Sequence, residues 1–553
     1  MNKSINENLD NKYKQILENI KKGNIKKYDS NIQAYFHILK SNLFDEDYYF
    51  SKYNPPISKE HSLLHYLDKG YKEGKNPSEK FDGNGYLKKY SDVKKVNANP
   101  LVHYVKYGIT EGRTPPLTPQ QKIEKELETL KIYTYQNRII QNINLLKSKV
   151  ATGKKINIIF ILPSMMFVYK ELYNFFEKDE LFNVKIVLVP HRIGNSPTIT
   201  NVAKDKFFQI LSYLKRAKFN VINGYDFENN CGIDLKVECE PDIVFYVLPY
   251  MRIYPETMKI DNLPPNILYA YIPYGEFLEN DLDDNLYNFG WNEKIWKIFC
   301  STKEYLLNSS KKSKVGSSNV ILSGSARMDS LVNYKYNDGD YKWIYDKSEN
   351  KKRIIWAPHH TLARPGMDEK ATFSTFDKNY KFFYNFAKNN PDIEWVLRPH
   401  PLLKEILSEV NTYMKIEGVI DDNFVEDYFF KWNSLPNAVV HEEFDYIDLF
   451  ATADAMITDC VSFKAEYLFA NKPGLILTRD NVNYEGYKKT VTDAWYIENG
   501  SDFNKITEFI DNVVIDGNDY LKNKREEIFK EHFDYNVGKA SKFIYNYIKN
   551  ELI

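Results

Sequence analysis

Two series of short, continuous apolar runs constrain the fold of this 553-residue chain more than any other feature. They begin at residue 155 and are separated by amphipathic segments. The first series is 157–162, 184–189, 242–248, 267–272 and 320–322, and the second is 353–357, 393–397, 438–440, 455–458 and 474–477. Apolar strands that alternate with helices are typical of parallel sheets buried on both faces. The pattern predicts an α/β fold with two doubly wound, Rossmann-like domains.

The break between the two series falls in a polar stretch near 334–350. With that break, the sequence predicts four parts: a helical repeat module at 1–117, a helical connector at 118–150, and Rossmann-like domains at 151–335 and 336–553. The connector opens at Thr118-Pro119, and proline in a first helical turn is a start signal. Ligands of such sheets bind at the carboxyl ends of the strands, so we expect a site where the two domains face each other across a cleft.

An internal repeat occupies the first 117 residues. Leu64-His65-Tyr66 is followed by Gly70 and Gly74, and Val102-His103-Tyr104 by Gly108 and Gly112, at an offset near 38 residues. Recurring aromatic and glycine positions indicate a small helical unit that is used twice. We interpret His65 and His103 as core residues, because no metal-ligand spacing accompanies them.

Composition narrows the classes of function. Lys+Arg and Asp+Glu both number 75, and this balance argues against broad nucleic-acid binding. The four cysteines are scattered, so we expect neither disulfides nor a zinc site, and a reducing compartment fits this pattern. The N-terminus has no apolar stretch behind its charges, and no run approaches the ~18 apolar residues of a membrane span. We therefore expect a cytoplasmic protein, with peripheral contact at the inner membrane face left open.

Polar residues follow two neighbouring strands of the second series. His359 and His360 come directly after 353–357, and Arg398 and His400 come after 393–397. Side chains at the carboxyl ends of parallel strands point toward the ligand site, so a functional role is favoured over core packing for this cluster.

The strand 455–458 runs into a helix through Thr458, Asp459 and Ser462, with Glu466 one turn further on. A helix N-terminus offers free N–H groups, and hydroxyls there add donors for a phosphate. Ser462 has the alternative role of an N-cap. Glu466 suits the hydroxyls of a ribose, with a solvated helix position as its alternative.

In the first series, Glu276 is the carboxylate placed immediately at a strand end, after Pro273-Tyr274-Gly275. A glycine turn after 320–322 leads through Ser325 to Arg327, which can hold a phosphate. This pattern on its own is weak.

Taken in order, several of these motifs resemble the CDP-glycerol glycerophosphotransferase family, the teichoic-acid and capsule polymerases. The matching stretches are Ser323–Asp329 (SGSARMD), Trp356–Thr361 (WAPHHT), Arg398–Pro401 (RPHP), Asp445–Phe450, and Ile457–Ser462 (ITDCVS) running on to Asn471-Lys472-Pro473. They extend over roughly 230 residues. The N-terminal repeat resembles modules attached to bacterial surface-polysaccharide glycosyltransferases. One departure concerns the first domain, where many members carry Trp-His-Gly and this chain has Ile272-Pro273-Tyr274-Gly275-Glu276.

The resemblance implies a glycosyltransferase-B-like architecture, with 151–335 on the acceptor side and 336–553 on the nucleotide-donor side. It implies transfer of an alditol phosphate from a CDP-linked donor to a polysaccharide or lipid-linked glycan acceptor, with release of CMP. It implies no cofactor. No Asp-x-Asp pair is present among the motifs, so we expect no metal at the diphosphate.

On this hypothesis Arg398 and His400 contact the diphosphate, and Thr458, Asp459 and Ser462 lie at the donor phosphates or cytidine. The acceptor proton goes to His359, His360 or Glu276. Two alternatives stay open: sugar transfer from a nucleotide sugar on the same fold, and a glycan-binding scaffold without catalysis.

Overall fold

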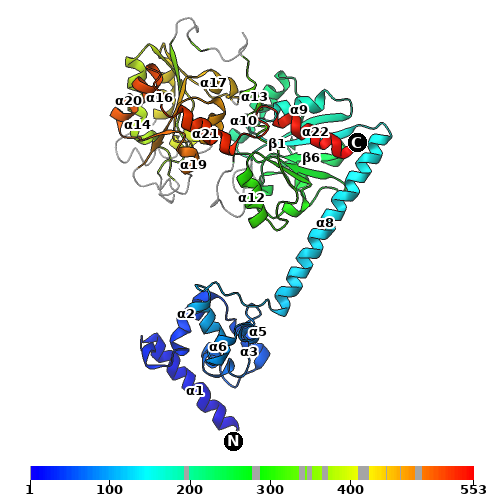
Figure 1. The fold of residues 1–553 in the computed structure, drawn as a ribbon, viewed down its shortest axis with the longest axis vertical. Coiled ribbons are helices and arrows are strands. Elements are labelled where there is room, and N and C mark those ends of the chain that lie inside the picture. Colours follow the sequence, from blue (N-terminus) through cyan, green and yellow to red (C-terminus); the bar gives the residue numbers. More distant parts are fainter. Residues whose placement is uncertain are drawn as a thin grey trace. The chain divides into compact units, whose positions relative to one another are not determined.

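The computed structural model of the protein describes residues 2–191, 199–276, 287–335, 343–344, 351–363, 372–408, 423–443, 445–460, 463–479 and 489–553. The chain forms two compact units, Met1–Thr134 and Tyr135–Ile553 (Figure 1). No helix within the described ranges combines the length and the apolar character needed to cross a bilayer.

The smaller unit is helical and built on the repeat. Its helices are α1 (Asn2–Lys21), α2 (Tyr35–Ser41), α3 (Glu46–Tyr53), α4 (Ser62–His65), α5 (Gly83–Lys89), α6 (Ser91–Lys95) and α7 (Pro100–His103). Asp45 caps α3 by accepting from the Tyr48 N–H, and Asp82 caps α5 by accepting from the Gly85 N–H. The two copies therefore start their helices with the same side-chain capping device.

Each repeat also contains the same tyrosine–histidine pair. The Tyr49 hydroxyl lies 2.8 Å from Nδ1 of His65, and the Tyr86 hydroxyl lies 3.2 Å from Nδ1 of His103. A Cβ atom at Gly70 would overlap the Tyr49 hydroxyl, so the close approach requires glycine at this position. The contacts place both histidines in the packing of the repeats.

Helix α8 (Pro119–Ala151) follows the repeats and contains the boundary between the two units. Thr118 and Gln121 begin it as a capping box: the Gln121 N–H donates to Thr118 Oγ1 at 3.2 Å, and the Thr118 N–H donates to Gln121 Oε1 at 2.9 Å. This reciprocal pair satisfies two donors at the helix start and explains why the helix begins here.

The larger unit contains two parallel sheets. The first has the order β3-β2-β1-β6-β7-β8-β9. Its strands are β1 (Ile156–Pro163), β2 (Phe182–Val189), β3 (Val221–Asn223), β6 (Ile243–Tyr246), β7 (Leu268–Tyr271), β8 (Lys297–Cys300) and β9 (Val320–Leu322). Its helices are α9 (Lys170–Glu177), α10 (Asn201–Arg216), α11 (Leu235–Cys239), α12 (Lys303–Lys312) and α13 (Asp329–Val332), and a small ribbon of β4 (Tyr225–Asp226) and β5 (Cys231–Gly232) stands apart.

The second sheet has the order β12-β11-β10-β13-β14-β15. Its strands are β10 (Lys352–Ala357), β11 (Ile393–Leu397), β12 (Ala438–Val440), β13 (Ala455–Thr458), β14 (Gly474–Thr478) and β15 (Tyr496–Asn499). Its helices are α14 (Phe376–Asn389), α16 (Phe424–Asn433), α17 (Ile447–Thr452), α18 (Phe463–Glu466), α19 (Lys489–Thr492), α20 (Phe503–Glu508) and α21 (Lys522–His532). In both sheets the order reverses beside the first strand, as in doubly wound folds. The predicted α/β, glycosyltransferase-B-like class is confirmed.

The last helix, α22 (Ala540–Leu552), returns to the first sheet (Figure 1). Its apolar face joins the core of that sheet through Ile544 and Ile548. Asp179, in the turn between α9 and β2, accepts from the Tyr545 hydroxyl at 2.5 Å and from Lys549 Nζ at 2.6 Å. The chain therefore passes from the first sheet to the second and back again.

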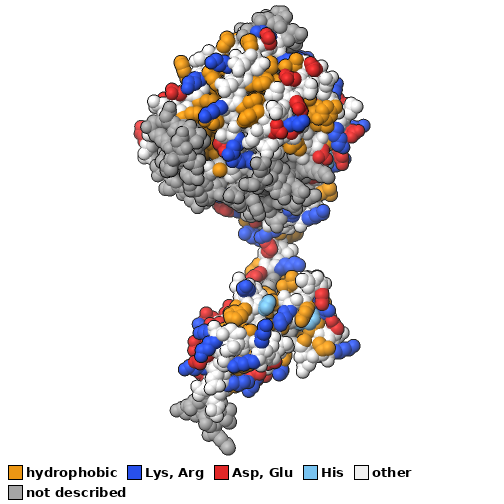
Figure 2. All heavy atoms as spheres, turned by 90° about the vertical axis from the view of Figure 1, so that its left-hand side faces the viewer, with side chains coloured by type: hydrophobic (Ala, Val, Ile, Leu, Met, Phe, Trp, Pro, Cys, Tyr) orange, Lys and Arg blue, Asp and Glu red, His pale blue; other side chains and the backbone are white. Residues whose placement is uncertain are grey.

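Charges of both signs are interspersed on the face of the protein drawn in Figure 2. This agrees with the net charge of zero. A binding site for a phosphorylated ligand must therefore draw on local groups rather than on the charge of the whole chain.

Candidate active site

Three histidines gather at the carboxyl ends of two neighbouring strands. His359 and His360 follow β10, and His400 follows β11, which pairs with β10 in parallel. The ring centroids lie 4.3 Å apart for His359 and His360, 4.9 Å for His359 and His400, and 4.0 Å for His360 and His400. The His400 N–H donates to the Pro358 carbonyl at 3.0 Å, which holds the two strand ends together. The sheet thus brings together the three histidines that the sequence predicted as site residues.

Two histidines of this cluster, His359 and His400, are held neutral by their surroundings. Burial lowers the pKa of His359 to about 3 and the pKa of His400 to about 2, and the neighbouring rings lower both values further. Nδ1 of His400 accepts from the Leu402 N–H at 3.1 Å, so the proton of this neutral ring sits on Nε2. His400 can therefore donate a hydrogen bond through Nε2 without carrying a charge.

The same geometry bears on metal binding. One ring nitrogen from each of the three histidines lies within 4.8 Å of the others, a spacing that could hold an ion. A metal ion bound to Nε2 of His400 would require the ring proton to sit on Nδ1. That proton would then point at the Leu402 N–H, whose hydrogen bond Nδ1 now accepts. At His400, the present hydrogen bond therefore favours an anionic oxygen as the partner of Nε2 over a cation.

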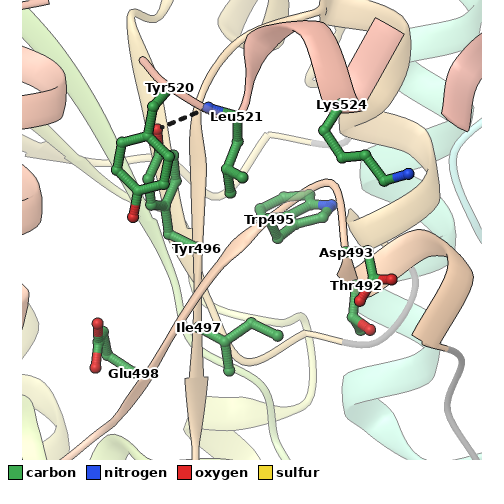
Figure 3. Close-up of a pocket in the computed structure, with 9 residues that line it drawn as sticks. All are labelled: Thr492, Asp493, Trp495, Tyr496, Ile497, Glu498, Tyr520, Leu521 and Lys524. Atoms are coloured by element: carbon green, nitrogen blue, oxygen red, sulfur yellow. Dashed lines mark hydrogen bonds between the residues drawn. The ribbon is translucent and has the colours of Figure 1, made fainter. Parts of the chain in front are cut away.

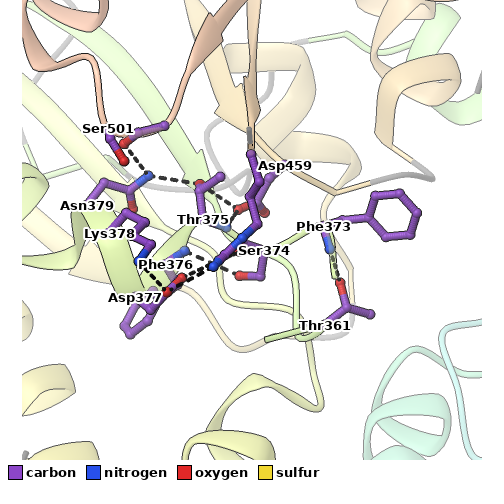
Figure 4. Close-up of polar contacts among 12 residues, drawn as sticks. Thr361, Phe373, Ser374, Thr375, Phe376, Asp377, Lys378, Asn379, Asp459 and Ser501 are labelled. Carbon is purple, nitrogen blue, oxygen red and sulfur yellow. Dashed lines mark hydrogen bonds and ion pairs between the residues drawn. The ribbon is translucent and has the colours of Figure 1, made fainter. Parts of the chain in front are cut away.

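Asp459 supports the loop that carries the histidines, and Figure 4 shows its carboxylate beside Thr375. One carboxylate oxygen accepts from the His359 N–H at 2.5 Å, and the other accepts from the N–H and the hydroxyl of Thr375 at 2.5 and 2.8 Å. Burial raises the pKa of Asp459 to about 6, although these hydrogen bonds oppose the shift. The carboxylate thus joins the end of β13 to the loop after β10 and to the start of α14.

Thr458 is fully buried and its hydroxyl is engaged locally. It donates to the Ala357 carbonyl at 2.7 Å and accepts from the Cys460 N–H at 2.9 Å. These contacts tie β13 to β10 beside the histidines. A direct phosphate contact by Thr458 stays a prediction, and Ser462 lies outside the described residues.

Arg398 leaves the end of β11 and is enclosed by the segment after β12. Its guanidinium donates to Nδ1 of His441 at 2.5 Å and to the Glu443 carbonyl at 3.0 Å, and it lies 4.9 Å from the centre of the Tyr446 ring. Burial and then the charge of Arg398 lower the pKa of His441 to about 3. The sequence analysis missed His441, although it stands at a strand end just as His359 and His400 do.

Arg327 and Glu466 form an ion pair between the two sheets. The Arg327 guanidinium donates to Glu466 Oε1 at 2.6 Å, and the Tyr446 hydroxyl donates to Oε2 at 2.6 Å. Arg327 and Glu466 are 7% and 2% exposed, so removal of either partner would leave a buried charge, at a cost of about 3–5 kcal/mol. The pair therefore stabilises the docking of the sheets, and ribose binding by Glu466 stays a prediction.

Glu276 lies at the end of β7 and contacts the same junction. The Ser325 hydroxyl donates to Glu276 Oε1. Burial raises the pKa of Glu276, while the hydroxyls of Ser301 and Ser325 and the charge of Arg327 oppose the shift. The site residues thus form two groups, the histidine cluster with Asp459 and Arg398, and the Glu276–Ser325–Arg327–Glu466 group. Ser301, at the end of β8, was missed because the sequence analysis missed that strand.

Lys464 is a second functional candidate that the sequence analysis missed. It is 4% exposed in the first turn of α18, and burial lowers its pKa to about 8. Its charge is one of the causes that lower the pKa of His359. From sequence alone, a lysine in the first turn of a helix is expected to be exposed to solvent. Nothing in the sequence therefore indicated that Lys464 is buried beside the site.

A separate, open hollow of about 440 Å³ lies beside β15, an edge strand of the second sheet (Figure 3). Trp495, Tyr496 and Glu498 of the β15 region line it together with Tyr520 and Lys524. The Leu521 N–H donates to the Tyr496 hydroxyl at 3.3 Å across its wall. It contains none of the predicted site residues, so the chemistry is assigned to the strand ends instead.

Several solved structures are similar to this chain. A variant of the wall teichoic acid polymerase TagF covers 76% of this chain and 98% of its own, with 15% identity and a TM-score of 0.46. The S. aureus MnaA–UDP structure covers 72% and 98%, with 15% identity and a TM-score of 0.42. UDP-GlcNAc 2-epimerase from Neisseria meningitidis, bound to UDP-GlcNAc, covers 71% and 99%, with 15% identity and a TM-score of 0.41.

A comparison with curated protein sequences gave no match. A family model does match: residues 279–550 fit the family described as CDP-Glycerol:Poly(glycerophosphate) glycerophosphotransferase. The matched region contains the histidine cluster, Arg398, Asp459 and both partners of the buried ion pair. These residues thus lie in the part of the chain, just under half of it, that matches the CDP-glycerol:poly(glycerophosphate) glycerophosphotransferase family, and the match indicates a transferase.

Proposed function

We propose that the chain transfers glycerol phosphate from CDP-glycerol to a hydroxyl of a polysaccharide or teichoic-acid-like acceptor and releases CMP. The observation that carries the proposal is the histidine cluster at the ends of β10 and β11, inside the family match, in which His359 and His400 are held neutral. Neutral imidazoles fixed at strand ends are preorganised donors for phosphate oxygens.

In the proposed reaction the acceptor oxygen attacks the phosphorus that carries the glycerol. The new P–O bond forms as the bond to the CMP oxygen breaks, and CMP leaves with that electron pair. His400 donates through Nε2 to an oxygen of the diphosphate, where negative charge builds up. Because the folded chain already holds the His400 ring in place, little reorganisation of this hydrogen-bond donor accompanies the reaction.

The proton of the attacking hydroxyl needs an acceptor. His359, with a pKa of about 3, is too weak a base for this role. Burial raises the pKa of Glu276, which makes its carboxylate a stronger base than an exposed glutamate. We assign the proton to Glu276, at the strand end where many family members carry a histidine instead.

Arg398 has a supporting role in this proposal. Its guanidinium holds His441 and the Glu443 carbonyl and so shapes the wall beside His400. Asp459 likewise positions His359 through its backbone N–H. We place the reaction in the cytoplasm and propose that the acceptor is presented at the inner membrane face.

The test is a panel of CDP-glycerol, CDP-ribitol and UDP-linked sugars, each offered with a glycerophosphate oligomer as acceptor. CMP release with CDP-glycerol, dependent on the acceptor, is the expected result. Turnover of a UDP-linked sugar without turnover of any CDP-alditol would replace the donor assignment. Tryptophan fluorescence with CDP, UDP and GDP adds a binding readout, and a scaffold without catalysis would bind none of the three.

A further inference from the structure

The donor diphosphate carries two negative charges, and among the groups described so far Lys464, beside His359, is a cation that can balance one of them. The rings of His359 and His400 are neutral at pH 7. Arg327 is paired with Glu466, and Arg398 is enclosed by His441 and Tyr446. A site for a diphosphate needs a further cation close to His400.

Helix α10 of the first sheet faces the second sheet at this place. The Tyr213 hydroxyl donates to Asp445 Oδ2 at 3.3 Å, and Asp445 caps the start of α17 by accepting from the Ile447 N–H at 3.0 Å. Lys206 lies seven residues before Tyr213, so both side chains project from the same side of the helix, about 10 Å apart along its axis. The side of α10 that carries Lys206 therefore faces the second sheet.

Lys206 lies at the carboxyl edge of the first sheet. It is in the second turn of α10, the helix that follows β2, and Thr200 caps this helix by accepting from the Ala203 N–H. Its side chain is half-buried, and burial lowers its pKa, with Glu405 opposing the shift. Its charge contributes to the lowered pKa of His400 on the second sheet and of His191 after β2. The charge of Lys206 thus affects one histidine on each sheet.

We propose that Lys206 binds the diphosphate of the nucleotide-linked donor from the first sheet, opposite the Nε2 donor of His400 on the second. The ligand then joins the two sheets, with a point charge on one side and neutral hydrogen-bond donors on the other. This assignment rests on the proposed function, and it concerns residues that precede the family match at 279–550.

The experiment measures the binding of CDP-glycerol, CDP, cytidine and inorganic pyrophosphate to the full chain and to Lys206→Gln and Lys206→Arg. A charged hydrogen bond of this kind supports about a 10- to 100-fold change in affinity. We expect that loss for CDP-glycerol, CDP and pyrophosphate with Lys206→Gln, no change for cytidine, and partial recovery with Lys206→Arg. The matched control is Lys215→Gln, which removes an exposed lysine from the same helix.

The outcomes separate the two proposals. If wild type turns over CDP-glycerol and Lys206→Gln binds all four ligands like wild type, Lys206 has no such role and the proposed function stands. If pyrophosphate binding depends on Lys206 but no CDP-alditol is turned over, the cation site stands and the donor assignment falls. Equal losses with Lys206→Gln and Lys215→Gln would show an effect of total charge and would overturn the proposal. Wild type that binds neither CDP nor pyrophosphate would overturn it as well.

Discussion

Histidines serve the two units of this protein in opposite ways. In the repeat unit, His65 and His103 each share one hydrogen bond with a tyrosine of the same repeat. The tyrosine–histidine pair is thus present in both copies. In the larger unit, three histidines from two strand ends lie against one another in tilted and edge-on arrangements. Burial lowers the pKa of His65 and His103 as it does that of His359 and His400, so burial alone does not distinguish a structural histidine from a functional one. The difference lies in whether each ring is satisfied within its own motif or is held among other rings at a sheet edge.

The largest expected effect separates the two kinds of histidine directly. His400→Ala removes a preorganised donor, so we expect turnover to fall by about 10²–10³ while the protein stays folded. CMP release and thermal unfolding, measured on the same preparation, check this. The matched variant His103→Ala should leave turnover within a few-fold. An unchanged rate for His400→Ala would move the chemistry to Glu276 and its surroundings.

Acid should weaken both units, because both bury neutral histidines. The pKa is about 2 for His400, about 3 for His359 and about 4 for His65, each below the ordinary 6.5. A lowered pKa gives stability that is fully present above about pH 6.5 and is lost as the pH falls toward the folded value. At pH 5 each such histidine costs at most about 2 kcal/mol of unfolding free energy.

Thermal unfolding between pH 7.5 and pH 5, with and without CDP, sharpens this prediction. CDP binds only the larger unit in our proposal, so it should protect that unit and leave the acid sensitivity of the repeats unchanged. If the unfolding temperature stayed constant as the pH was lowered from 6.5 to 5, that result would contradict the burial of neutral rings.

A stability effect without a catalytic effect is expected in the repeats. Tyr49→Phe removes the hydroxyl that contacts His65 Nδ1 and leaves a buried polar atom without its partner, at a cost of about 1–3 kcal/mol. The same change at Tyr86 should cost less, because His103 is more exposed than His65. Denaturant unfolding measures both, and turnover of the folded variants should equal wild type. A catalytic defect in a stable Tyr49→Phe protein would tie the repeats to the reaction.

The smallest expected effect is that of chelation. The Leu402 N–H occupies Nδ1 of His400, an arrangement that disfavours a metal at this ring, so turnover should survive EDTA. CMP release with EDTA and with added Mg²⁺ measures this. Complete loss in EDTA, restored by Mg²⁺ or Mn²⁺, would show that the cluster serves an ion, whereas mild stimulation would not.

Apolar runs made most of the fold predictable from the sequence. All ten predicted strands are present, and the strands of the two parallel sheets that were missed are β3, β8 and β15. β3 is half exposed, and β15 ends in the polar pair Glu498-Asn499, so neither has the continuous apolar character of a buried strand. β8 is short and begins with Lys297, which hid it in the same way.

Site residues could be predicted from the sequence only where they directly follow a single strand. His359, His360 and His400 follow directly from that rule, and His441 could have been found by it. The pairing of Arg327 with Glu466 depends on how the two sheets dock over a separation of 139 residues, which no local pattern encodes. Lys206 and Lys464 lie on helices, where a lysine is normally solvated, and only the tertiary structure shows their burial.

The return of α22 to the first sheet has a consequence for biosynthesis. Asp179 and Tyr545 are 366 residues apart, and the whole second sheet emerges from the ribosome between them. Until α22 arrives, the first sheet keeps part of its apolar surface uncovered during translation. The first sheet to be synthesised is therefore the last to be completed, and a nascent chain halted before residue 540 exposes a surface that chaperones recognise.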